Sequence, residues 1–200
     1  VVIKSLYKRW YIDGGFKCNG TIGEHVVMTS LYDDNAGNPL DTNGDGNATT
    51  PARGNWYNVQ FRDTSNDLYC AFTYTDMKYC GSSGAISTLN ASPVINTTLI
   101  DQSDYGLWID GNSAPSFNTV AIQNCYYDPI AISLTSNPTF TNITFSANGS
   151  NGIKIIEGTL SSNATLVKRN VAGYTNIPYI IGNLNVASGS VLTLEQGIIL

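Results

Sequence analysis

The sequence has few charged residues and a single histidine. Asp, Glu, Lys and Arg make up 12% of its 200 residues, about half of the usual share. The net charge is −5, and Lys8-Arg9 and Lys168-Arg169 are isolated pairs rather than a basic cluster. These absences argue against nucleic acid or an anionic membrane as a partner. With His25 as the only histidine, and beside a predicted strand, a Ser-His-Asp type of triad is effectively excluded.

Long apolar runs are also absent. No stretch of 18 apolar residues occurs, so we expect no segment to insert into a membrane. We recognise no signal peptide among these residues and expect none within them. Because the chain opens with Val1-Val2-Ile3-Lys4, in what reads as the middle of a strand, we expect it to be a piece of a longer protein.

Uncharged polar residues take the place of the missing charges. The chain contains 22 Asn, 20 Thr, 19 Gly and 18 Ser, so its surface is polar through amides and hydroxyls. This composition is typical of extracellular β-solenoids and surface proteins, and we expect an extracellular or cell-surface location. At 42% hydrophobic, with 12 Tyr and 3 Trp, the chain is too apolar to be disordered.

An internal repeat of 22–23 residues is the strongest signal. Gly84, Gly106, Pro129 and Gly152 are spaced by 22, 23 and 23 residues. A short segment with alternating apolar residues follows each of them, as a strand with one buried face requires. These segments are Ala85-Ile86-Ser87, Leu107-Trp108-Ile109, Ile130-Ala131-Ile132 and Ile153-Lys154-Ile155.

Two further strands complete each repeat. A proline (Pro93, Pro115 or Pro138) opens the second strand nine residues after the corner, and a third apolar segment follows it. Three short strands per rung predict an all-β, parallel β-helix whose like residues stack in columns. We interpret residues 1–200 as a single module, most regular at 84–156, with an acidic loop insertion at about 33–53. About eight rungs of 4.8 Å would form a rod roughly 40 Å long. A β-sandwich is the alternative fold, but it leaves the recurring corners unexplained.

Several motifs resemble a known family. The chain resembles right-handed parallel β-helix repeat proteins, pectate-lyase-like modules of large surface proteins that bacteria and archaea secrete. The resemblance rests on Val1-Val2-Ile3-Lys4, Asn19-Gly20-Thr21, the runs 26–30, 33–34 and 41–49, Gly54-Asn55-Trp56, and the closing run 182–197. It implies the fold and secretion, and it says little about function, because fold does not imply activity.

The two ends suggest stacking. In the family pattern the segment that matches Leu192–Gly197 runs directly into the one that matches Val1–Lys4. Aligning Ile198 with Val1 gives a unit of about 197 residues whose end leads into its own beginning. We therefore hypothesise a structural, adhesive module that stacks end to end on copies of itself or on neighbouring β-helix modules, in a tandem array or a filament.

The acidic insertion carries a motif for calcium. Asp41, Asn43 and Asp45 stand at positions 1, 3 and 5, and Gly46 at position 6, of a calcium-loop pattern. Position 12 is Ala52, so the glutamate of that pattern is missing. Asp33 and Asp34 are candidates for the missing carboxylates. The alternative is a solvated turn without a metal, because Asp, Asn and Gly favour turns.

A carbohydrate site is the alternative function. Trp108 follows one corner, and Tyr105, Tyr126 and Tyr127 lie just before corners, where aromatic rings can contact sugars. A polysaccharide lyase or glycoside hydrolase would need paired carboxylates across a groove, with Asp104 and Asp128 facing each other. The acidic residues are too sparse for that, and we expect no enzyme. The alternative for the aromatic residues is packing against a loop.

Asparagines and cysteines offer modification sites. Seven asparagines begin Asn-x-Ser/Thr and are candidates for glycosylation: Asn19, Asn47, Asn90, Asn96, Asn142, Asn148 and Asn163. The four cysteines have no CxxC spacing, which disfavours zinc. We expect one or two disulfides among Cys18, Cys70, Cys80 and Cys125. Cys80 and Cys125 share a column two rungs apart, roughly 9.6 Å and beyond disulfide reach, so each would need another partner.

Overall fold

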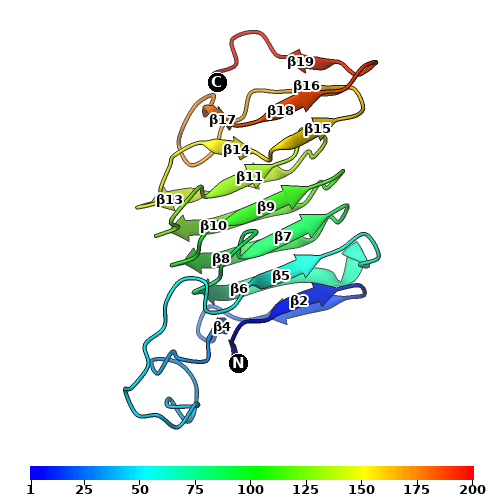
Figure 1. Cartoon of the computed structure of the whole chain (residues 1–200). Coiled ribbons are helices and arrows are strands. Elements are labelled where there is room, and N and C mark those ends of the chain that lie inside the picture. Colours follow the sequence, from blue (N-terminus) through cyan, green and yellow to red (C-terminus); the bar gives the residue numbers. More distant parts are fainter.

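A computed structural model describes all 200 residues as one right-handed coil of parallel strands. The chain climbs from the N-terminus at one end to the C-terminus at the other (Figure 1). The predicted parallel β-helix is thereby confirmed. The single helical element is the three-residue 3-10 turn η1 (Asp67–Tyr69). No helix is long and apolar enough to cross a membrane.

One face of the coil is a seven-stranded sheet. Each coil contributes one short strand to it, and every neighbour pair is parallel. In spatial order its strands are β17 (Tyr179–Ile181), β14 (Ile153–Ile155), β11 (Ile130–Ile132), β9 (Leu107–Asp110), β7 (Ile86–Leu89), β5 (Asn58–Phe61) and β2 (Arg9–Ile12).

The other two faces form an eight-stranded sheet that bends at a corner. Its path runs through β1 (Val2–Ser5), β4 (Val26–Ser30), β6 (Cys70–Lys78), β8 (Val94–Asp101), β10 (Ser116–Gln123) and β12 (Thr139–Thr141). Off this path β3 (Phe16–Asn19) pairs with β6, and β13 (Thr144–Ser146) pairs with β10. Two small sheets near the C-terminus pair β15 (Gly158–Leu160) with β18 (Leu184–Val186), and β16 (Ala164–Leu166) with β19 (Leu192–Leu194).

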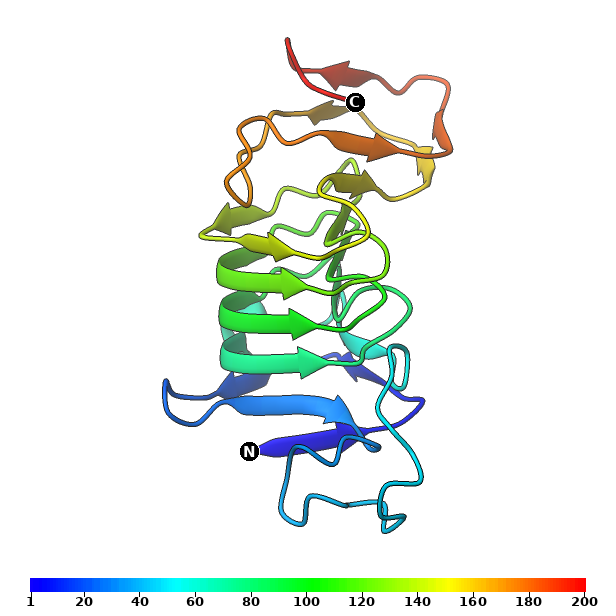
Figure 2. The same ribbon diagram turned by 90° about the vertical axis from the view of Figure 1, so that its left-hand side faces the viewer.

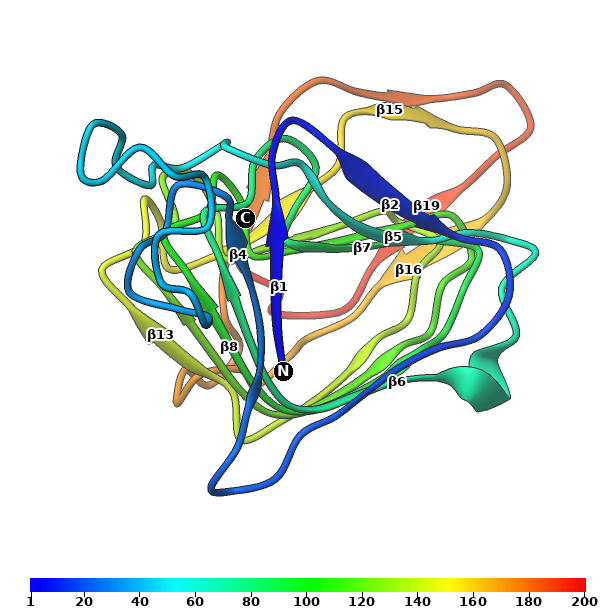
Figure 3. The same ribbon diagram turned by 90° about the horizontal axis from the view of Figure 1, so that it is seen from below.

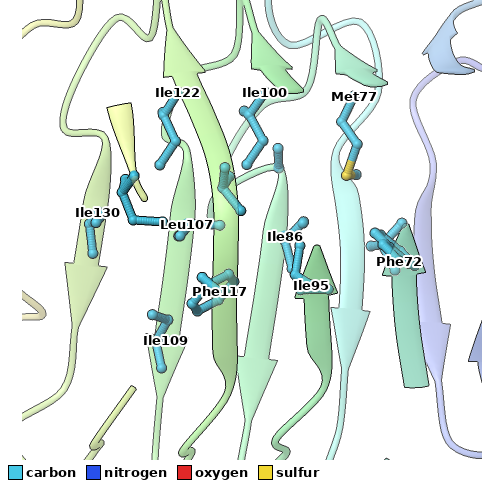
Figure 4. Packing of buried hydrophobic residues seen from close by; sticks show 14 of the residues in the cluster. Phe72, Met77, Ile86, Ile95, Ile100, Leu107, Ile109, Phe117, Ile122 and Ile130 are labelled. Atoms are coloured by element: carbon cyan, nitrogen blue, oxygen red, sulfur yellow. The ribbon is translucent and has the colours of Figure 1, made fainter. Parts of the chain in front are cut away.

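The predicted columns are present in the core. Phe72, Ile95, Phe117 and Phe140 face one another across β6, β8, β10 and β12. Because strands of period 2 stack in register, the residues at one position in successive coils share one environment. Figure 4 shows the resulting interior, where aliphatic and aromatic side chains from both sheets meet.

Glycine marks the corners where consecutive coils approach closely. A Cβ on Gly106 would lie 2.3 Å from the Pro129 carbonyl oxygen of the next coil. Gly84 adopts φ +75°, and a Cβ there would lie 2.8 Å from Trp108 N. Close stacking therefore requires glycine at these positions, and Gly84, Gly106 and Gly152 are the three glycine corners that the repeat predicts.

The bends inside the eight-stranded sheet use non-glycine residues in the left-handed region. One column consists of Tyr74, Thr97, Thr119 and Asn142, with φ between 43° and 57°. A second column consists of Tyr79, Gln102, Asn124 and Ala147. Several of these bend residues are followed by a residue whose hydroxyl donates to the carbonyl two positions before it. Thr98, which follows Thr97, donates from Oγ1 to Asn96 O at 3.0 Å. Side chains thus satisfy backbone groups that the bend frees.

The predicted acidic insertion lies outside the coil. No strand occurs between the end of β4 at Ser30 and the start of β5 at Asn58. Figures 1 and 2 show this segment extending past β1 at the N-terminal end, and Figure 3 shows it to one side of the coil. Lys4 Nζ of β1 donates to Leu40 O at 2.6 Å. Ser30 Oγ donates to Asn55 Oδ1 at 2.8 Å, which brings the two ends of the segment together.

Candidate functional site

Each coil has a turn just before its strand of the seven-stranded sheet. These turns are hydrogen-bonded to one another from coil to coil and form a ladder along the coil axis. In each coil a backbone N–H of this turn donates to a carbonyl of the coil below. Tyr57 N bonds Lys8 O at 2.9 Å, Asp104 N bonds Cys80 O at 3.0 Å, and Tyr127 N bonds Asp104 O at 2.9 Å. Side chains of this turn are therefore held in a column with the strand spacing of about 4.8 Å.

Four aromatic residues form one continuous cluster on this ladder. The Tyr105 ring stacks on Tyr127 with centroids 4.8 Å apart and contacts Trp108 edge-on at 5.3 Å. Tyr126 meets Tyr127 edge-on at 4.6 Å. Tyr126 and Tyr127 are 56% and 47% exposed. The structure thus brings together all four aromatic candidates that the sequence singled out.

A shallow groove of about 830 Å³ runs beside the cluster. One wall is the end of the acidic insertion, Pro51, Ala52 and Arg53, and the floor and other wall are Gln102, Asp104, Asn124, Tyr126 and Tyr127. The Arg53 guanidinium lies over the Tyr126 ring, 4.5 Å from its centroid. The lining therefore combines aromatic faces with amide, carboxylate and guanidinium groups. Sequence reasoning missed Arg53, because only the folded insertion brings it to this turn.

The electrostatics of the cluster are set by burial and by acidic neighbours. Burial raises the pKa of the Tyr105 hydroxyl, and Asp128, Tyr127 and Asp104 raise it further. Tyr105 therefore stays a neutral phenol at physiological pH. Asp104 Oδ2 accepts a hydrogen bond from Ser82 N at 3.2 Å. Asp128 Oδ1 accepts one from Ser150 Oγ at 2.7 Å, and Asp128 does not line the groove.

A second aromatic patch lies lower on the same ladder. A hollow of about 400 Å³ is lined by Tyr7, Lys8, Arg9, Tyr11, Tyr57 and Ser82. The Arg9 guanidinium lies 5.7 Å from the Tyr11 centroid and 5.9 Å from that of Tyr57. Arg9 Nη2 also donates to Ser82 Oγ at 3.1 Å. Ser82 in turn bonds Asp104 of the groove, so the two patches are connected. The isolated pair Lys8-Arg9 in the sequence gave no sign of this patch.

Three of the five predicted calcium ligands lie together in the insertion. One carboxylate oxygen from each of Asp34, Asp41 and Asp45 lies within 4.8 Å of the other two. Asp41 accepts hydrogen bonds from the backbone N–H groups of Gly46 and Gly44, which hold its pKa below the usual value. Asn43 is linked to Asp45 through Thr49: Asn43 Nδ2 donates to Thr49 Oγ1 at 3.0 Å, and that hydroxyl donates to Asp45 Oδ2 at 2.6 Å.

Asp33 lies outside this cluster. Its Oδ2 accepts a hydrogen bond from Thr29 Oγ1 at 2.6 Å, and its Oδ1 accepts one from Asn35 N at 3.1 Å. The residue is buried at the end of β4. Both oxygens are therefore used to hold the start of the insertion, and the structure gives Asp33 a local role instead of a place among the clustered carboxylates.

The four candidate cysteines are not paired with one another in this chain. All four cysteines are buried free thiols. Cys80 and Cys125 stand in one column with Ser103 in the coil between them, and each side chain lies near the carbonyl two residues earlier. The distances are 3.9 Å for Cys80 to Lys78 O, 3.4 Å for Ser103 to Asp101 O and 3.8 Å for Cys125 to Gln123 O. The cysteines thus serve as small donors at a bend, as a serine does.

The other two cysteines also lie apart in register. Cys18 of β3 faces Phe72, and Cys70 faces Phe16. Cys70 Sγ lies 3.3 Å from Gly14 O. Burial raises the pKa of Cys18 to about 11 and that of Cys125 to about 12. Thiols of this kind are inert at neutral pH.

The seven candidate glycosylation sites differ in exposure. Asn19, Asn47, Asn90, Asn142 and Asn163 are exposed, whereas Asn96 and Asn148 are partly buried. Asn148 Oδ1 accepts a hydrogen bond from Cys125 N at 3.0 Å, and its Nδ2 donates to Ile122 O at 2.9 Å. The Asn148 amide is therefore a structural link to the coil below.

The fold and the ladder define a parallel β-solenoid with an aromatic groove along one turn. The family model described as right handed beta helix region matches residues 51–193, well over half of the chain. The chain belongs to this family of right-handed β-helix proteins. Searches against curated proteins and solved structures gave no match.

Proposed function

We propose that the chain is an adhesive module of an extracellular or cell-surface protein that binds carbohydrate along the aromatic ladder. The observation that supports this most is the joined cluster of Tyr105, Trp108, Tyr126 and Tyr127 beside a polar groove. Exposed tyrosines in a contiguous patch mark a binding surface rather than a core.

The chemistry of the groove suits a sugar. The apolar faces of sugar rings pack against aromatic rings, while phenol, amide and carboxylate groups supply donors and acceptors for hydroxyls. Gln102, Asn124 and Asp104 provide those polar groups. Arg53 over Tyr126 makes the upper patch cationic in part, and Arg9 does the same in the lower one. An acidic or neutral glycan fits this mixture better than a basic ligand.

The ladder suits a polymer more than a single sugar. Tyr57 and Tyr127 occupy the same turn three coils apart, with Gly81 and Asp104 between them. Three strand spacings place the two tyrosines about 14 Å apart. A glycan chain that lies along the coil axis would contact both patches, and its affinity would gain from the two contacts acting together.

Binding assays with variants of the exposed tyrosines test this proposal. A panel of soluble oligosaccharides and insoluble polysaccharides is mixed with the wild type, with Tyr127→Ala and with Tyr174→Ala. Tyr174 is similarly exposed but lies on a distant loop, so it is the matched control. Loss of one aromatic contact costs about 0.5–1.5 kcal/mol, and Tyr127→Ala should bind up to roughly tenfold more weakly. Absence of binding to every glycan, or equal weakening by both variants, would contradict the proposal.

Turnover on the same panel addresses the enzyme alternative. We assign binding rather than catalysis because Asp104 is the one carboxylate that lines the groove. Lyase or hydrolase activity would release unsaturated products or new reducing ends from a polysaccharide. If such products appear and Asp104→Asn abolishes them, the groove is a catalytic site and the proposal is replaced.

End-to-end stacking is a second candidate function, favoured by the apolar ends of the coil. Val1, just before the edge strand β1, and Val2, its first residue, are 80% and 38% exposed. Ile199 and Leu200 are 48% and 60% exposed. An edge strand offers unpaired backbone groups to another chain. Either a copy of this chain or a neighbouring β-helix module would supply that strand.

The two ends of the chain lie beside different sheets of the coil. Tyr179 N of β17 donates to Ile199 O at 3.0 Å, so the end of the chain lies next to the edge of the seven-stranded sheet. Val2–Ser5, as β1, lies in the eight-stranded sheet instead. Aligning Ile198 with Val1, as the sequence suggests, therefore joins two different faces of the coil. Stacked modules would need an additional strand or a rotation between them.

Electron microscopy and sedimentation test the stacking. The wild type should form filaments or concentration-dependent oligomers, and Val2→Lys should prevent them by placing a charge at the edge. Val94→Lys is the control, because Val94 has similar exposure on the side of the coil. Dispersed single rods from the wild type at all concentrations would count against stacking.

A further inference from the structure

The acidic cluster of the insertion contains oxygens with no hydrogen-bond donor. Asp34 Oδ1, Asn43 Oδ1 and Asp45 Oδ1 are each sealed from solvent and accept no hydrogen bond. Buried acceptors in folded proteins almost always have a partner. Three unpartnered oxygens within one short segment therefore point to a partner that is not a group of this chain.

The charge of the cluster specifies what that partner is. Asp34, Asp41 and Asp45 bring one carboxylate oxygen each to within 4.8 Å of one another. Lys4 acts electrostatically on Asp41, and its ammonium donates to Leu40 O at 2.6 Å. Three carboxylates that converge with one lysine nearby leave uncompensated negative charge, which a cation at their centre would neutralise.

We propose that Asp34, Asp41, Asn43 and Asp45 bind one calcium ion. The three clustered carboxylates and the unpartnered Asn43 Oδ1 of the same turn are hard oxygens, which suit calcium or magnesium, and the cluster contains no histidine or cysteine to favour zinc. Calcium accepts six to eight oxygens in irregular geometry, while magnesium requires a regular octahedron. An irregular loop of carboxylate, amide and backbone oxygens, with water completing the shell, fits calcium.

Asp34 has a special place in this site. Asp41, Asn43 and Asp45 come from one turn, whereas Asp34 lies seven residues before Asp41, just after β4. An ion bound by both parts cross-links the far end of the insertion to its base on the coil. Unlike Asp33, whose oxygens are both bonded within the chain, Asp34 has an oxygen left for the ion.

A short stretch of chain also connects the proposed calcium site to the groove. Residues 46–50 connect the cluster to Pro51–Arg53, the wall of the groove, and Ala52 N donates to Asn55 Oδ1 at 2.7 Å. The ion would therefore fix the wall that carries Arg53 over Tyr126. This consequence depends on the proposed function, but calcium binding itself does not.

Isothermal titration calorimetry on the metal-free protein tests the site. Calcium chloride should bind at one site per chain with a dissociation constant of about 10⁻⁴–10⁻³ M, the range of extracellular modules. Magnesium chloride should bind at least tenfold more weakly. Limited proteolysis is the second measurement: calcium should protect residues 36–50 from cleavage, and chelation should restore it.

Variants identify the ligands. Asp34→Asn and Asp45→Asn should each weaken calcium binding at least tenfold, and Asp63→Asn should leave it unchanged, because Asp63 is exposed on another loop. No heat and no protection by 10 mM calcium, a roughly tenfold excess over the weakest expected constant, would overturn the proposal. So would equal affinity for magnesium, or wild-type binding by both ligand variants. Because no glycan is used, failure of the carbohydrate assays leaves these outcomes unaffected.

Discussion

Phe117 is the residue whose removal should damage the coil most. It is 1% exposed on β10, and it faces Ile95 in the coil below and Phe140 in the coil above. Its ring stacks on that of Phe140 with centroids 5.6 Å apart and planes 16° from parallel. In Phe117→Ala the ring is lost from the middle of the column, and the hydrogen-bonded registers on both sides keep the neighbours from closing the gap.

The expected loss follows from the size of the cavity. Truncation of a buried phenylalanine to alanine costs about 3–5 kcal/mol, and the upper part of that range applies where the site cannot collapse. A solenoid is stabilised by contacts between adjacent coils, so a defect in β10 also weakens the coupling between the coils before and after it. Phe145→Ala is the control, because Phe145 of β13 is only partly buried.

Urea unfolding followed by far-UV circular dichroism and by tryptophan fluorescence measures both effects. Trp56 and Trp108 report on different coils. Phe117→Ala should lower the unfolding midpoint strongly, and the circular dichroism and fluorescence signals should then show distinct transitions. Phe145→Ala should lower the free energy of unfolding by less than half as much. A loss below about 1 kcal/mol for Phe117→Ala, or the same loss for both variants, would refute the reasoning.

Three further predictions concern the bends and the buried thiols. Asn148→Ala removes both hydrogen bonds to the coil below and should cost about 1–3 kcal/mol in urea unfolding; an unchanged midpoint would show that the amide is dispensable. Thr119→Asn replaces a β-branched residue at φ 57° with one that tolerates this region, and should raise the free energy of unfolding by up to about 1 kcal/mol. Because the pKa of Cys18 is raised from 9.0 to about 11, its stabilising contribution is complete below pH 9 and is lost as the pH rises to 11. Unfolding midpoints at pH 8 to 11 should therefore fall for the wild type more than for Cys18→Ala, and a thiol reagent at pH 8 should label Cys18 only after denaturation.

The coil could be predicted because the residues that define its repeat recur for physical reasons. Gly106 is needed where the next coil approaches its Cα, and apolar residues alternate because each strand has one face inside. Leu107, Ile130 and Ile153 share a column in the structure as they do in the repeat. The strand after Gly84 is one residue out of the predicted register, because Ile86 and not Ala85 pairs with Leu107. Spacing alone was therefore enough to give the strands and the register of the later repeats, but not the register of the strand after Gly84.

The left-handed bends could not be read from single residues. Tyrosine and threonine rarely adopt positive φ. Tyr74, Thr97 and Thr119 do so here, because the stacking of the coils imposes this conformation on them. The signal that was available is the residue that follows: Thr75 and Thr98 occupy the same position in successive coils and donate to the carbonyl two residues back. Cys80 and Cys125 follow the same rule, since each lies near the carbonyl two residues back, and counting cysteines could not distinguish this role from a disulfide.

The aromatic site was predicted in part for a related reason. Tyr105, Trp108, Tyr126 and Tyr127 belong to regular coils, so the repeat placed them near one another. Arg53 belongs to an insertion that no repeat describes, and its position over Tyr126 depends on how that insertion folds. Sequence patterns thus locate residues on the coil but not residues that a loop brings back to it.

The insertion is where recognition by this module would be decided. A long surface loop costs little entropy to close, because the cost grows only with the logarithm of its length. Binding residues on loops are positioned by the rigid scaffold beneath them. Here the scaffold supplies the spacing of Tyr126 and Tyr127, while the insertion supplies Arg53 and the Asp34–Asp45 cluster. If calcium holds the insertion closed, affinity for a glycan should depend on calcium even though no ligand of the ion lines the groove. Loss of the ion would then leave the aromatic cluster in place and remove one wall, so weak, less selective binding would remain.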